Sequence, residues 1–216
     1  MPRESLDAKR ARAVKIIREL RRLYPEPRTV LTYRSKFELL IAVILSAQAT
    51  DSSVNAVTPQ LFSRFPSQES LASADLSELS AVLKPVGLAN SKAKAIKETA
   101  RMSRYQFGSE VPSTVEELML LRGVGRKTAL VVLGEGFGVA EGIAVDTHVN
   151  RVSQRLGFTR YKDPVRIERD LIKVIQRKDW IATNHLLIFH GRAICKARLP
   201  LCTQCVLNKL CPSARE

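Results

Sequence analysis

Apolar residues recur at helical spacing along almost the whole chain, and this periodicity limits the possible folds more than any other feature. No segment alternates apolar and polar residues over the length of a strand, and there is no internal repeat. The first clear stripe is Val14, Ile17, Leu20 and Leu23, in a basic helix that should end at the prolines after Tyr24. The pattern predicts an all-α protein of roughly ten short helices.

Capping residues mark several helix starts. Ser35 is followed three residues later by Glu38, which has the form of a capping box. Asp75, Ser113 and Asp163 begin similar stretches, and the proline after Asp163 suits a first helical position.

A glycine-rich stretch near the middle predicts a linker between two packed units, at residues 140–142. It is the part of the chain expected to be most flexible, with Gly134, Gly136, Gly138 and Gly142.

The chain has 216 residues and is 45% hydrophobic, enough for one large domain or two small ones. Its net charge of +14 and pI of about 10.1 suggest a polyanionic partner, although a merely soluble basic protein explains the charge equally well. No apolar run reaches the roughly 18 residues that span a bilayer, and the first residues lack a signal-peptide core. We therefore expect a cytoplasmic protein that works beside DNA and not in a membrane.

The segment 121–129 places Gly123, Val124 and Gly125 between two predicted helices. Such a turn directs backbone N–H groups and the positive end of the second helix toward a phosphate oxygen. This predicts a helix–hairpin–helix that binds the DNA backbone without reading sequence. From the two glycines alone, an ordinary glycine turn between helices is the favoured alternative, and the flanking Arg126 and Lys127 narrow that preference.

Lys127 lies in the first turn of the second helix, beside Arg126. The positive helix end and the neighbouring guanidinium both disfavour a charged amine at this position. A neutral amine can attack a sugar carbon and form a Schiff base. The alternative is a surface lysine that contacts phosphate.

The four cysteines, Cys195, Cys202, Cys205 and Cys211, are spaced C-x6-C-x2-C-x5-C. In a reducing compartment they are expected to bind metal rather than form disulfides. Four thiolates can hold a [4Fe–4S] cluster or a zinc ion, and the single C-x2-C pair favours the cluster modestly. Lys196 and Arg198 lie between the first two cysteines and are expected to form a basic loop that touches phosphates.

Together these segments resemble the endonuclease III family of DNA glycosylases. The residues 121–133 resemble its hairpin, and 145–152 resemble its second signature. The stretches 45–51 and 86–93 are also similar to the family, and the likeness extends from about Leu39 to Cys211.

The resemblance implies a six-helix barrel domain at 29–140 and an iron–sulfur domain built from 1–28 and 141–216. It also implies a base-excision repair glycosylase and apurinic/apyrimidinic lyase that acts as a monomer on damaged double-stranded DNA. The expected substrates are oxidised or ring-saturated pyrimidines, and the strand is nicked 3′ of the abasic site by β-elimination. The family raises the preference for [4Fe–4S] over zinc.

The resemblance also implies residue roles. Lys127 is the nucleophile that attacks C1′, and Asp146 activates it and stabilises positive charge on the sugar. Asp146 can equally be the N-cap of a helix at 147–156. Gln48 fills the gap left by the flipped base, and Leu88 is an apolar wedge that enters the duplex. His148 is expected to be structural more often than functional.

Some residues depart from the family pattern. Arg122 stands where proline is usual, Leu130 where asparagine is usual, and Met119 where many relatives have a carboxylate. The connection from Lys127 to Asp146 is one residue longer than is usual. Two other functions fit the chain less well: a non-catalytic DNA-binding module, and a monofunctional adenine or mismatch glycosylase, whose relatives generally lack the nucleophilic lysine.

Overall fold

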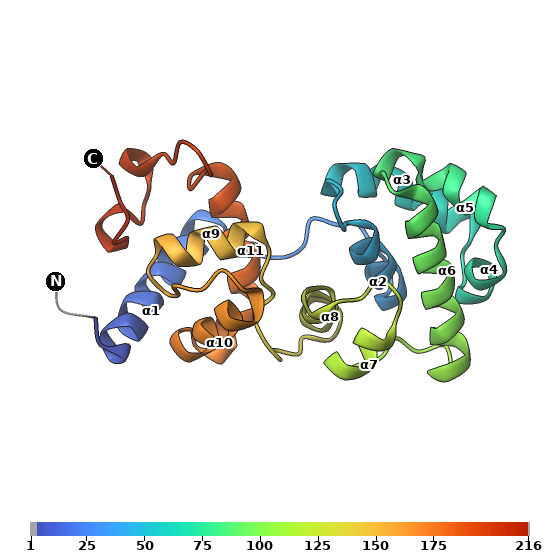
Figure 1. The fold of residues 1–216 in the computed structure, drawn as a ribbon, viewed down its shortest axis with the longest axis horizontal. Coiled ribbons are helices and arrows are strands. Elements are labelled where there is room, and N and C mark those ends of the chain that lie inside the picture. The colour runs from blue at the N-terminus through green and yellow to red at the C-terminus, as the bar shows by residue number, and fades with distance from the viewer. Residues whose placement is uncertain (1–3, 216) are drawn as a thin grey trace. The chain divides into compact units, whose positions relative to one another are not determined.

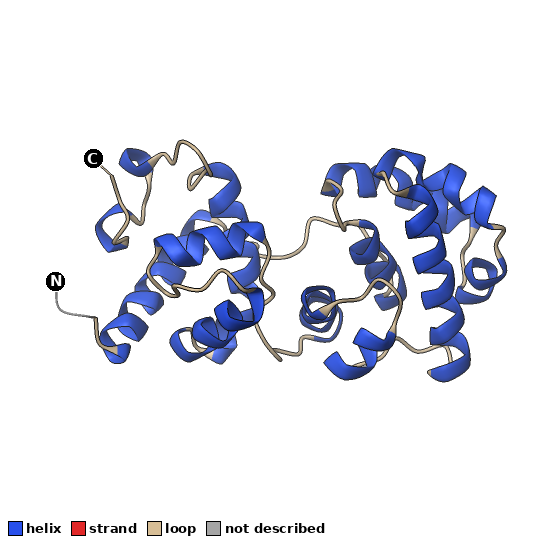
Figure 2. Ribbon diagram, in the orientation of Figure 1, coloured by secondary structure: helices blue, strands red, loops and turns tan. Residues whose placement is uncertain are grey.

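The structure, a computed structural model, describes residues 4–215, and these form helices joined by loops, with no strand among them (Figure 2). The predicted all-α class is confirmed. The chain divides into two compact units. One comprises the chain up to Thr29 together with the segment from Ala140 onward, and the other is Val30–Val139. None of the described helices is long and apolar enough to cross a membrane.

In the unit Val30–Val139, helix α2 (Lys36–Leu45) lies in the core, because its residues from Leu39 to Leu45 are all buried. Helices α4 and α5 pack against α6, and α8 packs against α2. The elements in order are α2 (Lys36–Leu45), α3 (Asp51–Arg64), α4 (Gln68–Ser73), α5 (Leu76–Leu83), a 3-10 turn (Lys84–Val86), α6 (Ala89–Gln106), α7 (Val115–Leu120), α8 (Arg126–Val132) and a π-helix (Leu133–Phe137).

In the other unit, the N-terminal helix packs against helices from the far end of the sequence, α10 and α11 (Figure 1). Its elements are α1 (Leu6–Leu23), α9 (Thr147–Arg155), α10 (Pro164–Val174) and α11 (Trp180–Ala193), with 3-10 turns at Arg177–Asp179, Cys202–Gln204 and Asn208–Leu210. Three of the cysteines, Cys195, Cys205 and Cys211, pack at the edge of the apolar core that these helices share.

The predicted stripe of α1 was wrong at two positions. Val14 and Leu23 are exposed, and the buried face is Ala13, Ile16, Ile17 and Leu20. The steps of three and four residues from Ala13 to Leu20 keep one face of a helix against the core, whereas Val14 lies off that face. The helix ends at Leu23, as the prolines predicted.

Three predicted helix starts are confirmed, because Ser35, Asp75 and Asp163 each accept a hydrogen bond from a backbone N–H of the following turn. The Glu38 carboxylate accepts from the N–H of Arg34, one residue before the cap. The start predicted at Ser113 was one residue early. Thr114 is the N-cap there and accepts from the N–H of Glu117.

The glycine-rich segment is ordered more than the sequence suggested. Residues Leu133–Phe137 form a single π-helical stretch that extends α8. Gly136 lies against α2, where a Cβ atom would meet Leu39 Cδ2 at 3.2 Å. The ammonium of Lys36 lies 4.0 Å from the centroid of the Phe137 ring. The absence of a side chain at Gly136 therefore allows this segment to pack closely against α2.

Candidate nucleic-acid interface and cysteine cavity

The turn between α7 and α8 is tied to α6. The hydroxyl of Thr99 donates to the carbonyl of Arg122 at 3.0 Å. Gly123 has φ +83°, and a Cβ atom there would meet the side chains of Ala95 and Ile44 at 3.3 Å. Glycine is thus required at this position both by backbone conformation and by space.

The rest of the turn is open. Gly125 has nothing within 4 Å of a Cβ position, and no side chain caps the N-terminus of α8 that it begins. Val124 is buried, so only its backbone can contact a ligand. The predicted hairpin therefore exposes its main chain at Gly123 and Gly125. Arg126, the first residue of α8, is half-buried.

Lys127 lies in the first turn of α8 with its side chain exposed. Its neighbour along the helix, Leu130, is buried in the core of the same unit. The structure thus brings Lys127 together with the hairpin turn.

Asp146 belongs to the other compact unit and is the N-cap of α9. Its Oδ1 accepts a hydrogen bond of 2.7 Å from the N–H of Val149. The capping alternative for this residue is therefore realised in the structure. A carboxylate held by its own helix has a fixed orientation, so capping is compatible with an electrostatic role.

Gln48 and Leu88 both lie at turns that precede a helix in the unit Val30–Val139. Their φ angles are 53° and 51°, in the left-handed region that non-glycine residues rarely adopt. Both are exposed, and 59% of the surface of Leu88 is accessible. An exposed leucine on a disfavoured backbone contributes nothing to this core, and such strain is often found at functional positions.

The four cysteines line one cavity of about 190 Å³ in the unit that contains both chain ends. All four are free thiols and half-buried. Apolar side chains, among them Leu201 and Leu207, form much of the remaining wall. In residues 4–215, no group of three or more His, Cys, Asp or Glu side chains is arranged to hold a metal ion.

Burial raises the pKa of the Cys205 thiol, and the other three cysteines raise it further. Burial likewise raises the pKa of Cys211, again with contributions from neighbouring cysteines. Burial lowers the pKa of His190, whose ring faces Cys205, to about 4, so this imidazole is neutral at physiological pH. Four thiolates in this cavity would repel one another, and a cationic centre bound by all four would remove that cost.

Two arginines of α9 hold the loop that carries the first cysteine. Arg155 Nη1 lies 3.3 Å from Cys195 Sγ and donates to the carbonyl of Lys196 at 2.7 Å. Arg151 donates to the carbonyl of Cys195 at 3.1 Å. Neither arginine was predicted from the sequence, although their spacing of four residues does place them on one face of a helix.

The two basic residues predicted for this loop, Lys196 and Arg198, are both exposed. His148 contacts Arg151 through its Nδ1 at 3.1 Å, which agrees with a structural role.

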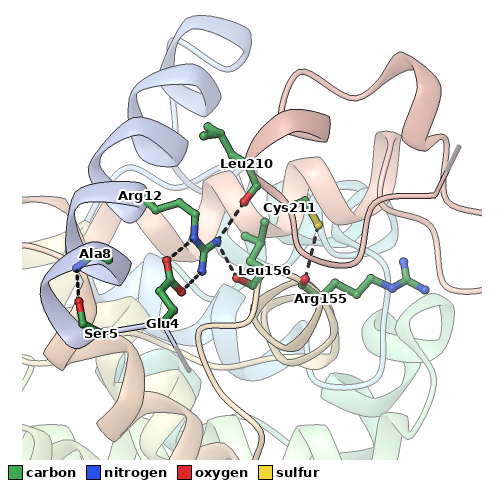
Figure 3. A network of polar contacts seen from close by, with 8 residues as sticks. All are labelled: Glu4, Ser5, Ala8, Arg12, Arg155, Leu156, Leu210 and Cys211. Atoms are coloured by element: carbon green, nitrogen blue, oxygen red, sulfur yellow. Dashed lines mark hydrogen bonds and ion pairs between the residues drawn. The ribbon is translucent and has the colours of Figure 1, made fainter. Parts of the chain in front are cut away.

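A third arginine, Arg12 of α1, holds the loop that carries the last cysteine (Figure 3). Its Nη1 donates to the carbonyls of Leu156 at 2.8 Å and Leu210 at 3.1 Å. Its Nε and Nη2 donate to the two carboxylate oxygens of Glu4. The Cys211 thiol, next to Leu210, donates to the carbonyl of Arg155 at 3.4 Å. The N-terminal helix is thereby bonded to the cysteine loop at the other end of the chain.

Residues 41–177 match the family model described as "HhH-GPD superfamily base excision DNA repair protein". The chain is 49% identical over 208 residues to "Endonuclease III" of Synechocystis sp., covering 96% of this chain and 95% of that protein. It is 42% identical to "Endonuclease III" of Escherichia coli K12, covering 94% and 95%.

Among solved structures, the fold is similar to that in "Structure of a Trapped Endonuclease III-DNA Covalent Intermediate: Estranged-Adenine Complex". The TM-score is 0.89 at 42% identity, over 95% of this chain and 96% of that one. The hairpin and the exposed lysine after it, together with the match over nearly the whole length of these relatives, lead to one conclusion: the chain belongs to the endonuclease III family of HhH-GPD base-excision repair DNA glycosylases.

Proposed function

We propose that this glycosylase uses the amine of Lys127 as its nucleophile and is also an abasic-site lyase. The Nζ–C1′ bond forms as the bond from C1′ to the base breaks, and the base leaves with the electron pair and takes up a proton. The ring then opens to a Schiff base. Loss of a C2′ proton breaks the C3′–O bond, which nicks the strand 3′ of the site. The observation that carries this proposal is an exposed lysine in the first turn of α8, directly after the hairpin.

Asp146 is the second member of the proposed site. Its carboxylate would help to deprotonate Lys127 and would stabilise positive charge as it develops on the sugar. The bond from Val149 engages Oδ1 and fixes the orientation of the group.

The proposed partner is damaged double-stranded DNA, with oxidised or ring-saturated pyrimidines as substrates. The backbone of Gly123, Val124 and Gly125, with Arg126, would hold a phosphate at the hairpin. Flipping a base out of the duplex costs about a few kcal/mol, which inserted side chains offset. The exposed, left-handed Gln48 and Leu88 suit this insertion.

The four cysteines are proposed to hold a [4Fe–4S] cluster. The cavity that all four line and the mutual repulsion of their thiolates support this assignment. Cys195, Cys202, Cys205 and Cys211 would hold the cluster, and their shared binding to it would cross-link the C-terminal loops. This would shape the segment that bears Lys196 and Arg198 for contact with phosphates. The unit with both chain ends would then be the cluster domain. The unit Val30–Val139, which carries the hairpin among its helices α2 to α8, would be the domain that was expected as a six-helix barrel. We propose that the enzyme acts as a monomer on DNA in the cytoplasm.

Borohydride trapping tests the lysine chemistry. A duplex with thymine glycol or an abasic site should give a covalent adduct that Lys127→Ala abolishes. Lys36→Ala is the matched control, because Lys36 is another exposed lysine in the first turn of a helix in the same unit. Base release by the unchanged protein without any adduct would instead indicate a monofunctional glycosylase.

The cluster is tested by analysis of the purified protein. Iron and inorganic sulfide with an absorbance shoulder near roughly 400 nm would support [4Fe–4S]. Stoichiometric zinc in a colourless protein would refute the assignment and leave the lysine chemistry untouched.

A further inference from the structure

Lys92 is a buried charged residue in the unit Val30–Val139, with 5% of its surface accessible. Its Nζ donates a 2.7 Å hydrogen bond to the carbonyl of Val86. Burial lowers the pKa of this amine. Burying an ammonium group is costly unless it is hydrogen-bonded. The bond to Val86 offsets part of that cost, and the burial of a lysine at this position suggests that the bond has a structural or functional role.

The turn that Lys92 bonds is the one that presents Leu88. It consists of the 3-10 turn Lys84–Val86 and then Gly87, at φ +66°. Leu88 follows as the N-cap residue of α6, and no side chain caps this helix end. The backbone N–H of Lys92 donates to the carbonyl of Leu88 at 2.9 Å. Lys92 therefore bonds the turn at two points, through its side chain to Val86 and through its main chain to Leu88.

We propose that Lys92 is a positioning residue that holds Leu88 in its exposed, left-handed conformation so that the leucine can enter the duplex. Without the bond to Val86, the turn can relax toward the right-handed backbone that a leucine prefers. The side chain would then leave its outward position. This inference rests on the proposed wedge role of Leu88.

The chain offers a matched control on the same helix. Lys97 Nζ donates to the carbonyl of Ala74 at the same distance, 2.7 Å. That carbonyl follows α4, so the bond holds the junction between α4 and α5 and not the turn of Leu88. Lys92→Met and Lys97→Met thus remove the same kind of bond, and only the first should affect the wedge.

The test compares adduct trapping on two DNA forms. A single-stranded abasic oligonucleotide has no stacked duplex to open, so it needs no wedge. On an abasic duplex, we expect Lys92→Met to lower the trapping rate about tenfold, the effect of losing one charged hydrogen bond. On the single strand, the rate should match that of Lys97→Met. An equal loss on both DNA forms would mean a general folding defect and overturn the proposal.

A double-mutant cycle with Leu88→Ala separates this inference from the wedge proposal. If Lys92 acts through Leu88, Lys92→Met should cause no further loss on the duplex in the Leu88→Ala background. Full additivity would overturn the positioning role. If Leu88→Ala alone leaves the duplex rate unchanged, the wedge proposal fails. If Leu88→Ala slows the duplex reaction but Lys92→Met does not, only the inference about Lys92 fails.

Discussion

Gln48 and Leu88 share a left-handed backbone conformation, at φ 53° and 51°, although neither is a glycine. An L-residue in this conformation costs about 1–2 kcal/mol. Both residues were expected, from resemblance alone, to enter the duplex. The structure thus adds a physical observation to that expectation: the backbone is in an unfavourable conformation at both positions, and the exposed side chains do not offset this by burial.

This strain predicts an unusual order of stabilities at Leu88. Leu88→Gly should be about 1 kcal/mol more stable than Leu88→Ala, because glycine adopts the left-handed region freely. Both variants should lose activity on duplex DNA. Chemical denaturation measures the difference. At Leu120, exposed in the right-handed helix α7, alanine should be the more stable of the two substitutions. The same order at both positions would contradict strain at Leu88.

The two glycines of the hairpin should respond differently to alanine. Gly123→Ala should lower the free energy of unfolding by about 1–3 kcal/mol, because φ is +83° and the added methyl meets Ala95 and Ile44. Gly125→Ala has open space and should leave the unfolding midpoint nearly unchanged. It should weaken duplex binding, since the methyl lies where the backbone would approach phosphate. Fluorescence anisotropy checks this, and undiminished affinity of Gly125→Ala would argue against phosphate contact at the turn.

Asparagine and alanine at position 146 should separate capping from chemistry. Asp146→Asn keeps a side-chain oxygen for the N–H of Val149, so stability should hold while glycosylase activity falls at least tenfold, a typical loss for a catalytic carboxylate. Asp146→Ala should also lower stability by about 1 kcal/mol. Asp163, the N-cap of α10, is the control. The asparagine and alanine substitutions at Asp163 should leave glycosylase activity unchanged, and only alanine should lower stability. Full activity in Asp146→Asn would show that Asp146 acts only as a helix cap.

Loss of the Arg12 contacts should loosen the cysteine loop. Arg12→Gln removes the fork that bonds Glu4, Leu156 and Leu210, so the bound cluster should be lost faster to an iron chelator. Bleaching of the absorbance reports this rate, and limited proteolysis of the cluster-free protein reports the loop itself. Arg10→Gln removes a bond on the same helix, to the carbonyl of Lys173, and should leave both unchanged. Equal rates for the two variants would exclude the Arg12 link.

Acid should weaken the same link. The hydrogen bond from Arg12 is the largest influence on the Glu4 carboxyl and holds its pKa below the usual value of 4.5. A carboxyl with a depressed pKa contributes stability above its unfolded pKa, and this contribution is lost as pH falls through the folded value. Glu4→Gln should therefore be less stable than the unchanged protein at neutral pH. This difference in the free energy of unfolding should shrink as the pH falls below about 4.5. It should be absent in an Arg12→Gln background. Denaturation across a pH series measures both.

Short-range signals in the sequence predicted much of the fold. Ser35, Asp75 and Asp163 begin helices because each supplies an oxygen to the first turn, an interaction contained within four residues. The error at Ser113 arose because two adjacent residues, Ser113 and Thr114, can both cap a helix. Which of the two does so depends on the packing of α7, which a local pattern does not contain.

The sequence indicated which residues to consider for the candidate site, but not the contacts that hold them in place. A glycine turn between two helices singled out Lys127, which lies in the first turn of α8, and the four cysteines singled out by their spacing line one cavity. The contacts of Lys92 and Arg12 could not be predicted from the sequence. Each bonds a backbone carbonyl whose position depends on the tertiary fold, and Arg12 reaches Leu210 from the far end of the sequence. The left-handed backbone of Leu88 was equally hidden, because leucine rarely adopts it.

The π-helix at Leu133–Phe137 bears on how insertions are tolerated in this family. A π-turn spaces its hydrogen bonds one residue wider than an α-turn and so takes up one extra residue of chain. It lies between Lys127 and Asp146, in the connection that the resemblance led us to expect to be one residue longer than usual. Helix α8 is α-helical up to Val132, so the π-helix begins downstream of Lys127. A one-residue insertion in this connection is therefore expected to lie in the π-helix, after Lys127 and before Asp146.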